Sequence, residues 1–376
     1  MKNVLVNDIS YSNHAVRNAI ISKIKYWGKH NYSFAIFTSK AGVSFYRKHL
    51  QNVSFIVLPY AEECPNKFLW IFEYLKRNSV ALFFVNNLIN KYDIVYSISS
   101  VLDLAIFPYV FKIFDKKIKW VVLFENVVPL NDPGNKLIRF LSWVFFHISL
   151  FTFRKADLLL PISDSLKEYL ISKEFKKNRL IVSGNGIEVD LIRRAKKDNK
   201  FNIDALFIGR INETKGIYDL LKVLQIVRKK YPNFQLAIMG RGDKTTEKQF
   251  KNEIIKNNLG KNVQLLGYKS DLEKFSIIKS SKIFLFLSVS ESFGISLLEA
   301  VCCGLKAVVY ELEPYKKIYL NNEVIMVTKN DYKSAAKKVM KLFDKRDFSN
   351  KNGELLLEQY SWDKIAKIEL NVFRNI

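Results

Sequence analysis

The segment IFLFLSVSESFGISLLEA, residues 283–300, combines a strand pattern with a helix start. Its first five residues are an apolar run of strand length, and helical spacing begins after Gly294. In an open α/β sheet, the end of such a strand and the start of the next helix form the usual ligand position. Glu291 lies in the turn and Glu299 lies two helical turns further on. The segment therefore predicts a parallel α/β sheet with a site at this edge.

An anion fits the start of this predicted helix. The backbone amides of Phe293, Gly294 and Ile295 are free there, and the helix dipole favours negative charge such as a phosphate. An ordinary structural explanation also exists for the two acids. Glu291 can be a helix-start acid and Glu299 a solvated residue on the helix face.

A second strand-to-helix transition carries two cations. The run ALFIGRINETKG, residues 205–216, places Arg210 at the strand end and Lys215 about one turn later. Two cations beside a turn of small residues suit a diphosphate, and Gly209 lets the backbone approach a ligand closely. The run LAIMGRGD, residues 236–243, repeats this form with Gly240.

Strand and helix patterns alternate along the whole chain, which predicts parallel sheets with right-handed crossovers. The basic segment 193–202 lacks apolar periodicity and predicts a linker between two doubly wound domains. The predicted strands are 3–6, 33–38, 53–58, 94–97, 119–124, 157–161, 180–182, 205–209, 235–239, 263–266, 283–287, 307–309 and 324–327.

These runs together resemble the GT-B-fold retaining glycosyltransferases of glycosyl transferases group 1. That family includes sucrose synthases, mannosyltransferases and many bacterial sugar transferases that act on lipid-linked acceptors. The two glutamates separated by seven residues, Gly209-Arg210 and Lys215-Gly216 belong to the resemblance. Three further pieces are ADLLLPIS at 156–163, NGIEVD at 185–190 and YSW at 360–362. The resemblance is strong from about residue 156 onward and weak before that.

The resemblance implies a GT-B fold, with two Rossmann-like doubly wound domains that face each other across a cleft. Residues 1–187 would form an acceptor-binding domain and residues 188–358 a domain for the nucleotide-sugar donor. Residues 359–376 would form a helix that returns to the first domain.

The resemblance also implies roles for the residues of the predicted site. Arg210 and Lys215 would neutralise the diphosphate. Glu299 would bind the ribose hydroxyls, and Glu291 would contact the donor sugar near the reacting face. Gly209, Gly240 and the amides of residues 293–295 would complete donor binding. No Asp-x-Asp metal motif is present, which is consistent with the two cations taking the place of a divalent ion.

The first domain departs from the family pattern in two places. Many members have a glycine-rich turn after the first strand, whereas residues 7–14 read NDISYSNH. The family often has a histidine after the strand at 119–124, but this chain has Glu125. Glu125 can replace that histidine as a catalytic hydrogen-bonding group. It can equally be a loop acid or a sign of altered activity.

The net charge of +24 calls for an anionic partner. Nothing in the sequence has the pattern of a nucleic-acid-binding motif, so an anionic membrane surface is the preferred partner. Val16, Ile20, Ile24 and Trp27 form a helical stripe among lysines that either faces the core or contacts that membrane. The apolar stretch 137–153 is short for a membrane span and contains polar groups, so it predicts a buried or membrane-surface helix.

The three cysteines, Cys64, Cys302 and Cys303, give no disulfide framework, and residues 1–8 do not read as a secretory signal. Both observations favour the cytoplasm, at or near the cytoplasmic face of the membrane.

The expected function is therefore a retaining, metal-independent glycosyltransferase of cell-surface polysaccharide, lipopolysaccharide or glycolipid synthesis. It would use a UDP- or GDP-linked sugar as substrate, a glycan or lipid-linked acceptor, and no separate cofactor. One alternative is a catalytically silent scaffold that binds an anionic lipid or glycan, and another is a nucleotide-sugar epimerase. A glycosidase also uses two carboxylates, but it would leave the cationic diphosphate site without a purpose.

Overall fold

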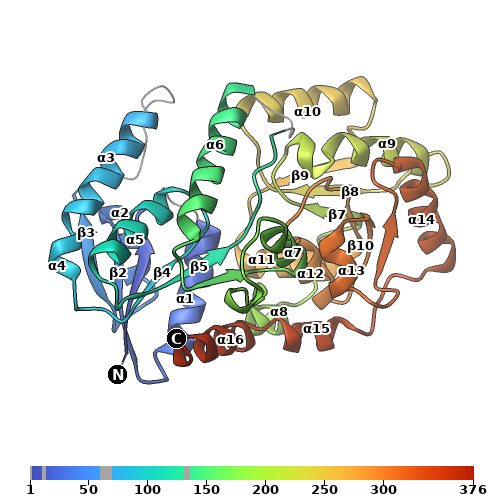
Figure 1. The fold of residues 1–376 in the computed structure, drawn as a ribbon. Helices are drawn as coiled ribbons and strands as arrows, with labels where there is room; N and C mark the ends of the chain where they lie inside the picture. Colours follow the sequence, from blue (N-terminus) through green and yellow to red (C-terminus); the bar gives the residue numbers. More distant parts are fainter. Residues whose placement is uncertain (1, 11–13, 60–69, 131–135) are drawn as a thin grey trace. The chain divides into compact units, whose positions relative to one another are not determined.

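The computed structural model describes residues 2–10, 14–59, 70–130 and 136–376. The chain forms two compact units, which Figure 1 shows in colours that follow the sequence. Unit 1 comprises Met1–Gly186 together with Trp362–Ile376, and unit 2 comprises Ile187–Ser361. The sequence had predicted boundaries after residues 187 and 358.

Unit 1 is built on a six-stranded parallel sheet with the strand order β3-β2-β1-β4-β5-β6. Most of its strand residues are buried, as expected for a parallel sheet with both faces covered, whereas the edge strand Ser54–Leu58 is partly exposed. They are β1 (Lys2–Asp8), β2 (Tyr32–Ser39), β3 (Ser54–Leu58), β4 (Ile94–Ser97), β5 (Lys119–Phe124) and β6 (Leu158–Pro161).

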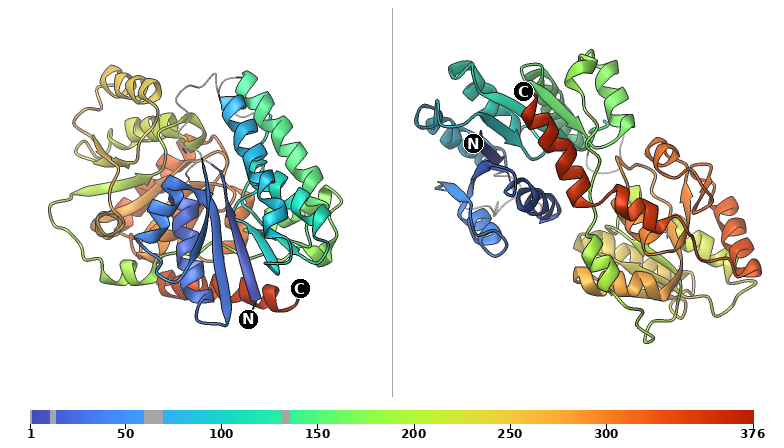
Figure 2. Two further views of the ribbon diagram at one scale, coloured as in Figure 1. Left: turned by 90° about the vertical axis from the view of Figure 1, so that its left-hand side faces the viewer. Right: turned by 90° about the horizontal axis from the view of Figure 1, so that it is seen from below.

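Two layers of helices cover this sheet (Figures 1 and 2). Helices α3, α5 and α6 lie on one face, where α5 contacts both of the others, and α1 packs against α16 on the other face. The helices are α1 (His14–Trp27), α2 (Lys40–Arg47), α3 (Trp70–Phe83), α4 (Val85–Leu88), α5 (Asp103–Phe114), α6 (Lys136–Phe153), α7 (Asp164–Ser172), the 3-10 turn η1 (Lys177–Arg179) and α16 (Trp362–Arg374).

Unit 2 repeats the same topology with its own six strands, in the order β12-β11-β10-β7-β8-β9. The strands are β7 (Ile203–Ile208), β8 (Leu236–Met239), β9 (Val263–Gly267), β10 (Ser281–Phe286), β11 (Lys306–Tyr310) and β12 (Val324–Val327). The helices are α8 (Val189–Arg194), the 3-10 turn η2 (Glu213–Lys215), α9 (Ile217–Val227), α10 (Lys244–Lys256), α11 (Asp271–Ser280), α12 (Ile295–Cys302), α13 (Glu313–Ile318), α14 (Tyr332–Lys345) and α15 (Gly353–Gln359).

All but one of the predicted strands are present, and the predicted two-sheet α/β fold is confirmed. The strand predicted at 180–182 is wrong. This segment follows β6 with a single bridge, Leu159 to Leu180. The amides of Ile181 and Ser183 donate to β6, but two hydrogen bonds at a sheet edge do not make a seventh strand.

The linker predicted at 193–202 is also wrong, because this segment lies inside unit 2. The Lys279 ammonium on α11 donates to the carbonyls of Ile192 at 2.5 Å and Ala195 at 2.8 Å. The Ser276 hydroxyl donates to the carbonyl of Lys196. Polar composition suggested a free connection, whereas these hydrogen bonds tie the segment to α11.

The apolar stripe of α1 faces the core, so it is not a membrane-binding surface. Trp27 is fully buried and donates from Nε1 to the carbonyl of Ala366 on α16 at 2.9 Å. Lys23 is also buried, and it pairs with Glu369 of α16 at 2.7 Å. Arg17 is buried in an ion pair with Asp8 at 2.7 Å. Arg17 and Lys23 therefore count toward the net charge of +24 without adding cations to the surface.

Two sequence predictions concern residues outside the described ranges. Cys64 and the residues 11–13 of the first turn lie there. Cys302 and Cys303 are free thiols on and just after α12.

Candidate active site

Three neighbouring strands of unit 2 bring the predicted site residues to one edge of the sheet. β10, β7 and β8 are adjacent, and the loops that follow them touch. The amide of Gly209 donates to the carbonyl of Met239 at 3.0 Å. The carbonyl of Thr214 accepts from the amide of Val289 at 2.9 Å and from the Ser288 hydroxyl at 3.1 Å. Motifs that are far apart in the sequence thus share one site.

The loop after β7 is a tight turn that positions Lys215. The side-chain oxygen of Asn212 accepts from the Lys215 amide at 3.1 Å and from the Thr214 hydroxyl at 2.9 Å. The turn ends at Gly216, whose φ is +70°. A Cβ there would lie 1.9 Å from the carbonyl oxygen of Leu287, so only glycine fits. The sequence prediction missed Asn212, although asparagine at this position of a helix start is a known capping signal.

Lys215 and Glu291 form an ion pair across the two loops. The ammonium of Lys215 donates to Oε1 of Glu291, and their side chains are only 18% and 11% exposed. The sequence assigned these residues to separate tasks, the diphosphate and the donor sugar. The structure joins them, so the charge of Lys215 is already partly balanced by Glu291 before any ligand is present.

Arg210 is the exposed cation of the site. It follows Gly209 at the end of β7, and its guanidinium has no hydrogen bond or ion pair within the described ranges. Gly240 has a φ of +142°, and a Cβ there would lie 1.9 Å from the carbonyl oxygen of Gly209. The loops after β7 and β8 approach each other so closely that only glycine fits at position 240.

The start of α12 presents the predicted amides. Gly294 has a φ of +82° and directly precedes Ile295, the first residue of the helix. The amides of residues 293–295 donate to no acceptor in the described part of the chain. Phe293 is buried against the Tyr360 ring, with centroids 5.6 Å apart. The Tyr315 hydroxyl is buried beside Gly294 and has no hydrogen-bond partner among the described residues. The sequence analysis did not point to Tyr315.

Glu299 lies on α12 and is buried, not solvated. Its Oε1 accepts from the Lys274 ammonium of α11 at 2.7 Å. Burial raises the pKa of Glu299, and the charge of Lys274 opposes this shift. Within the described residues the ion pair uses only Oε1, which leaves Oε2 for a ligand hydroxyl. No sequence signal pointed to Lys274.

Glu125 lies in unit 1, directly after β5, as predicted. Burial raises the pKa of the Glu125 carboxyl to about 7, while a hydrogen bond with Ser99 and the charge of Lys23 oppose this shift. A carboxyl group with this pKa can exchange a proton at neutral pH.

Next to Glu125, unit 1 has a cavity of about 390 Å³. Its acids Asp8 and Asp103 are paired with Arg17 and Arg77. Tyr74 and Phe145 give it flat aromatic walls, stacked with centroids 5.1 Å apart. The neutral polar groups that line the cavity come from Ser10, Ser99, Ser100, Asn126, Ser142 and Ser149.

Comparison with known proteins identifies a family match in unit 2 and several relatives. Residues 188–355 match the family model of glycosyl transferases group 1. An uncharacterized glycosyltransferase of Methanocaldococcus jannaschii is 29% identical, over 77% of this chain and 73% of that protein. The phosphatidyl-myo-inositol mannosyltransferase of Mycobacterium leprae is 27% identical over 51% of this chain, and the match spans 52% of that protein.

Among solved structures, the crystal structure of Anabaena Alr3699/HepE in complex with UDP and glucose is similar over 100% of both chains. The TM-score is 0.78 and the sequence identity is 13%, so this likeness concerns the fold alone. Together with the two parallel sheets it gives the chain the GT-B fold, and the match over residues 188–355 makes unit 2 similar to glycosyl transferases group 1.

Proposed function

We propose that the protein is a retaining glycosyltransferase that moves a sugar from a nucleotide-diphosphate sugar to a glycan or lipid-linked acceptor. The observation that carries this proposal is the convergence in unit 2 of Arg210, the Lys215–Glu291 pair and the start of α12. Cations, free amides and a carboxylate at one strand edge suit a diphosphate joined to a sugar. The family match over unit 2 supports the proposal.

The diphosphate would be held by charge and by backbone amides. Arg210 is exposed and can reach a phosphate. An ammonium has three N–H donors, and Glu291 uses one of those of Lys215, so Lys215 can bind Glu291 and a phosphate oxygen together. The amides of residues 293–295 and the dipole of α12 would add hydrogen bonds. With these groups we propose a reaction without a metal ion.

The remaining site residues would position the nucleoside and the sugar. Oε2 of Glu299 would accept a hydrogen bond from a ribose hydroxyl, with Lys274 holding the carboxylate in place. Gly209 would let the strand end approach the donor closely. Glu291 would face the donor sugar, where its charge favours the positive charge that develops at the anomeric carbon.

The proposed reaction breaks the bond between the anomeric carbon and the phosphate oxygen. An acceptor hydroxyl forms the new bond on the same face of the sugar, and the departing phosphate takes the hydroxyl proton. Arg210, Lys215 and the α12 amides would stabilise the diphosphate as its negative charge grows, which lowers the barrier more than it favours the ground state.

The acceptor would bind in the cavity of unit 1. Serine hydroxyls and Asn126 can exchange hydrogen bonds with sugar hydroxyls, and Tyr74 and Phe145 offer flat surfaces for a sugar ring. Glu125 would hydrogen-bond near the reacting sugar. We propose that the protein acts in the cytoplasm, at the cytoplasmic face of the membrane, in the synthesis of a cell-surface polysaccharide, lipopolysaccharide or glycolipid.

The first test is a thermal-shift panel with UDP, GDP, ADP and their sugar conjugates. A ligand at about a hundred times its dissociation constant should stabilise the folded protein by roughly 2.7 kcal/mol. We expect one UDP- or GDP-linked ligand to raise the melting temperature. The effect should disappear in Arg210→Ala/Lys215→Ala and persist in the control Lys244→Ala/Lys248→Ala, whose lysines are exposed on α10.

The outcomes separate the alternatives. No shift with any nucleotide would contradict the donor site and favour a silent scaffold. A shift followed by conversion of the nucleotide sugar to its epimer, without an acceptor, would favour an epimerase. Transfer to an acceptor with the anomeric configuration kept, read by NMR, would support the retaining reaction.

A further inference from the structure

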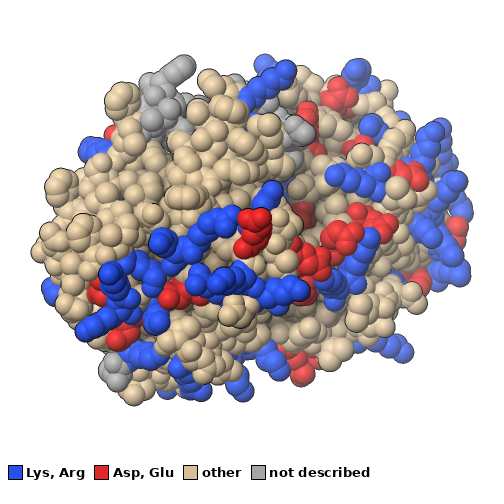
Figure 3. Space-filling view, viewed as in Figure 1, with Lys and Arg blue, Asp and Glu red and all other residues tan. Residues whose placement is uncertain are grey.

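The outer face of the α3, α5 and α6 layer in unit 1 is unusually apolar. Figure 3 shows a broad uncharged surface over these helices. Ten large apolar side chains are exposed on the three helices, against seven in all of unit 2, counted over the described residues. The ten are Phe72, Leu75, Phe83, Ile113, Phe114, Leu137, Ile138, Phe140, Ile148 and Phe151.

On α3 the exposed Phe72, Leu75 and Phe83 recur at helical spacing. On α6, positions 137, 141, 144, 148 and 151 follow the spacing of one helix face and are exposed or half-buried. The opposite side of α6 is buried through Phe146, Leu150 and Phe153. The helix therefore fills the core with one side and leaves a second apolar side uncovered.

Exposed cations border this face where α5 and α6 end. Lys116 and Lys117 follow Phe114, and Arg154 and Lys155 follow α6. In Figure 3 a band of Lys and Arg runs along the lower border of the uncharged surface. Three further lysines at the end of α7 and around η1 are also exposed, namely Lys173, Lys176 and Lys177.

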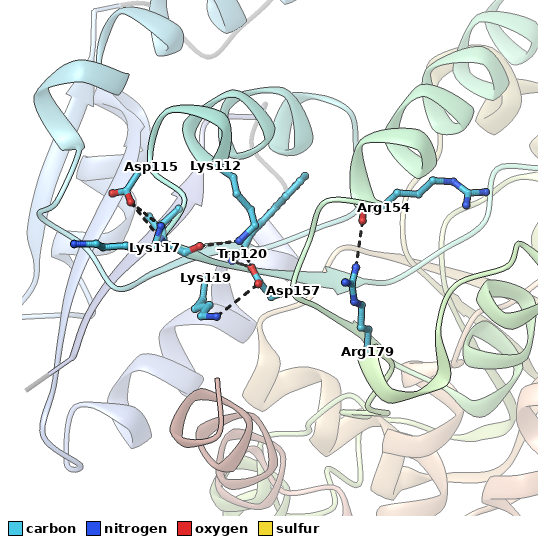
Figure 4. Close-up of polar contacts among 9 residues, drawn as sticks. Lys112, Asp115, Lys117, Lys119, Trp120, Arg154, Asp157 and Arg179 are labelled. Atoms are coloured by element: carbon cyan, nitrogen blue, oxygen red, sulfur yellow. Dashed lines mark hydrogen bonds and ion pairs between the residues drawn. The ribbon is translucent and has the colours of Figure 1, made fainter.

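Two acids of this region make internal contacts, and Lys116 and Lys117 have no acidic partner among the described residues, whereas Arg154 pairs with the exposed Glu174 at 3.6 Å. Asp115 is buried and accepts from the amides of Asn90 and Lys117, each at 3.0 Å. Asp157 accepts from the Lys112 ammonium at 2.6 Å and from the amide of Trp120 at 2.8 Å. Figure 4 shows the contact of Asp115 with Lys117 and the contacts of Asp157, together with the Arg179 guanidinium that donates to the carbonyl of Arg154 at 3.3 Å.

We propose that this face of unit 1 binds an anionic lipid bilayer. The exposed apolar side chains of α3, α5 and α6 would enter the interface between headgroups and acyl chains, and the cations at its border would contact lipid phosphates. This combination fits a bilayer better than nucleic acid, which offers no apolar surface of this extent. It also disfavours a second copy of the chain, because two cationic borders would repel each other.

This proposal extends the proposed function. Binding of this face to a bilayer does not depend on the proposed function, but the reason for that binding, access to a lipid-linked acceptor, rests on it. Ser142 and Phe145 of α6 line the acceptor cavity, while Leu141 and Val144 belong to the outer face. A lipid-linked acceptor could keep its tail in the bilayer while its sugar enters the cavity. By length and composition α6 could cross a membrane, with 28% of its residues buried, but its packing in unit 1 makes it a surface helix.

Sedimentation with vesicles tests the proposal on the full chain. One set of vesicles contains phosphatidylcholine alone and the other also contains phosphatidylglycerol at about one third. We expect binding to the anionic set, weakened by salt. Phe114→Ser/Phe151→Ser and Lys116→Glu/Lys117→Glu should each weaken it at least tenfold. The matched controls Ile255→Ser/Leu355→Ser and Lys244→Glu/Lys248→Glu, exposed in unit 2, should bind as the parent does.

Three results would overturn the proposal. These are no binding to anionic vesicles, equal losses in face and control variants, or a dimer in light scattering that the Phe114/Phe151 variant abolishes. The nucleotide thermal shift, measured without vesicles, serves as the independent readout. If that shift persists while vesicle binding fails, only the membrane surface is wrong, and if the shift is absent while vesicles bind, only the donor site is wrong.

Discussion

Units 1 and 2 share one strand order but end their first strands with opposite chemistry. β1 of unit 1 ends at Asp8, whose Oδ2 accepts from Arg17 at 2.7 Å and from the Tyr46 hydroxyl at 3.0 Å. β7 of unit 2 is followed by Gly209 and the exposed Arg210. In unit 1 the arginine is buried to hold an internal acid, whereas in unit 2 the arginine is available to a ligand.

This difference shows what the fold contributes to the site and what it leaves open. The shared topology creates a strand edge in each unit where a ligand can bind. The residues in the first turn then decide which ligand. A neutralised acid suits a neutral polar ligand such as a sugar, and an exposed cation beside a helix start suits a phosphate.

The largest expected effect comes from Asp8→Ala. Arg17 would remain buried without its partner, so the free energy of unfolding of unit 1 should fall by about 3–5 kcal/mol. Tryptophan fluorescence during urea unfolding reports this selectively, because all five tryptophans lie in unit 1. The control Asp164→Ala, at an exposed position, should change little. Equal effects of the two substitutions would contradict the buried pair.

Glu291→Gln should have the next largest effect, on activity. It keeps the size of the side chain and a hydrogen bond to Lys215 but removes the charge beside the donor sugar. We expect kcat to fall by roughly 10²–10³. Glu313→Gln, at an exposed position on α13, should stay within about twofold of the parent rate. A Glu291→Gln variant with the parent rate would exclude Glu291 from the chemistry.

Glu125 should produce a smaller effect that depends on pH. Since its pKa is about 7, the carboxyl goes from mostly protonated to mostly ionised between about pH 6 and 8, and kcat/KM should show this ionisation. The folded-state pKa lies above the unfolded one, so the stability of unit 1 should fall as pH rises through 7. Glu125→Gln should remove both dependences. If the pH profiles of Glu125→Gln match those of the parent, Glu125 is not the group that ionises near pH 7.

The smallest expected effect is that of Arg210→Ala on stability. Its side chain is exposed and unpaired within the described residues, so the free energy of unfolding should change by less than about 0.5 kcal/mol. Nucleotide affinity should still fall about tenfold. A destabilised variant would mean that Arg210 holds the fold together as Arg17 does, and the contrast between the units would fail.

Local patterns predicted the strands well and the surroundings of individual charges poorly. Continuous apolar runs such as residues 120–124 indicate strands because buried parallel strands contain few polar side chains. The segment 193–202 was wrongly predicted to be an interdomain linker, because its polar composition does not reveal the hydrogen bonds to α11. No local pattern reveals that Lys23 is buried, because its partner, Glu369, lies 346 positions away.

The sequence by itself determined the two α/β sheets, the positions of the strand-to-helix turns and the residue types within them. These depend on local periodicity and on glycines that a turn requires, as at Gly216. Only the tertiary structure paired Lys215 with Glu291, 76 positions away, and Glu299 with Lys274. It also moved Arg17 and Lys23 inside and left the outer side of α6 uncovered. Such pairings depend on strand order and on which helix faces the sheet, and both are set by the packing of distant segments.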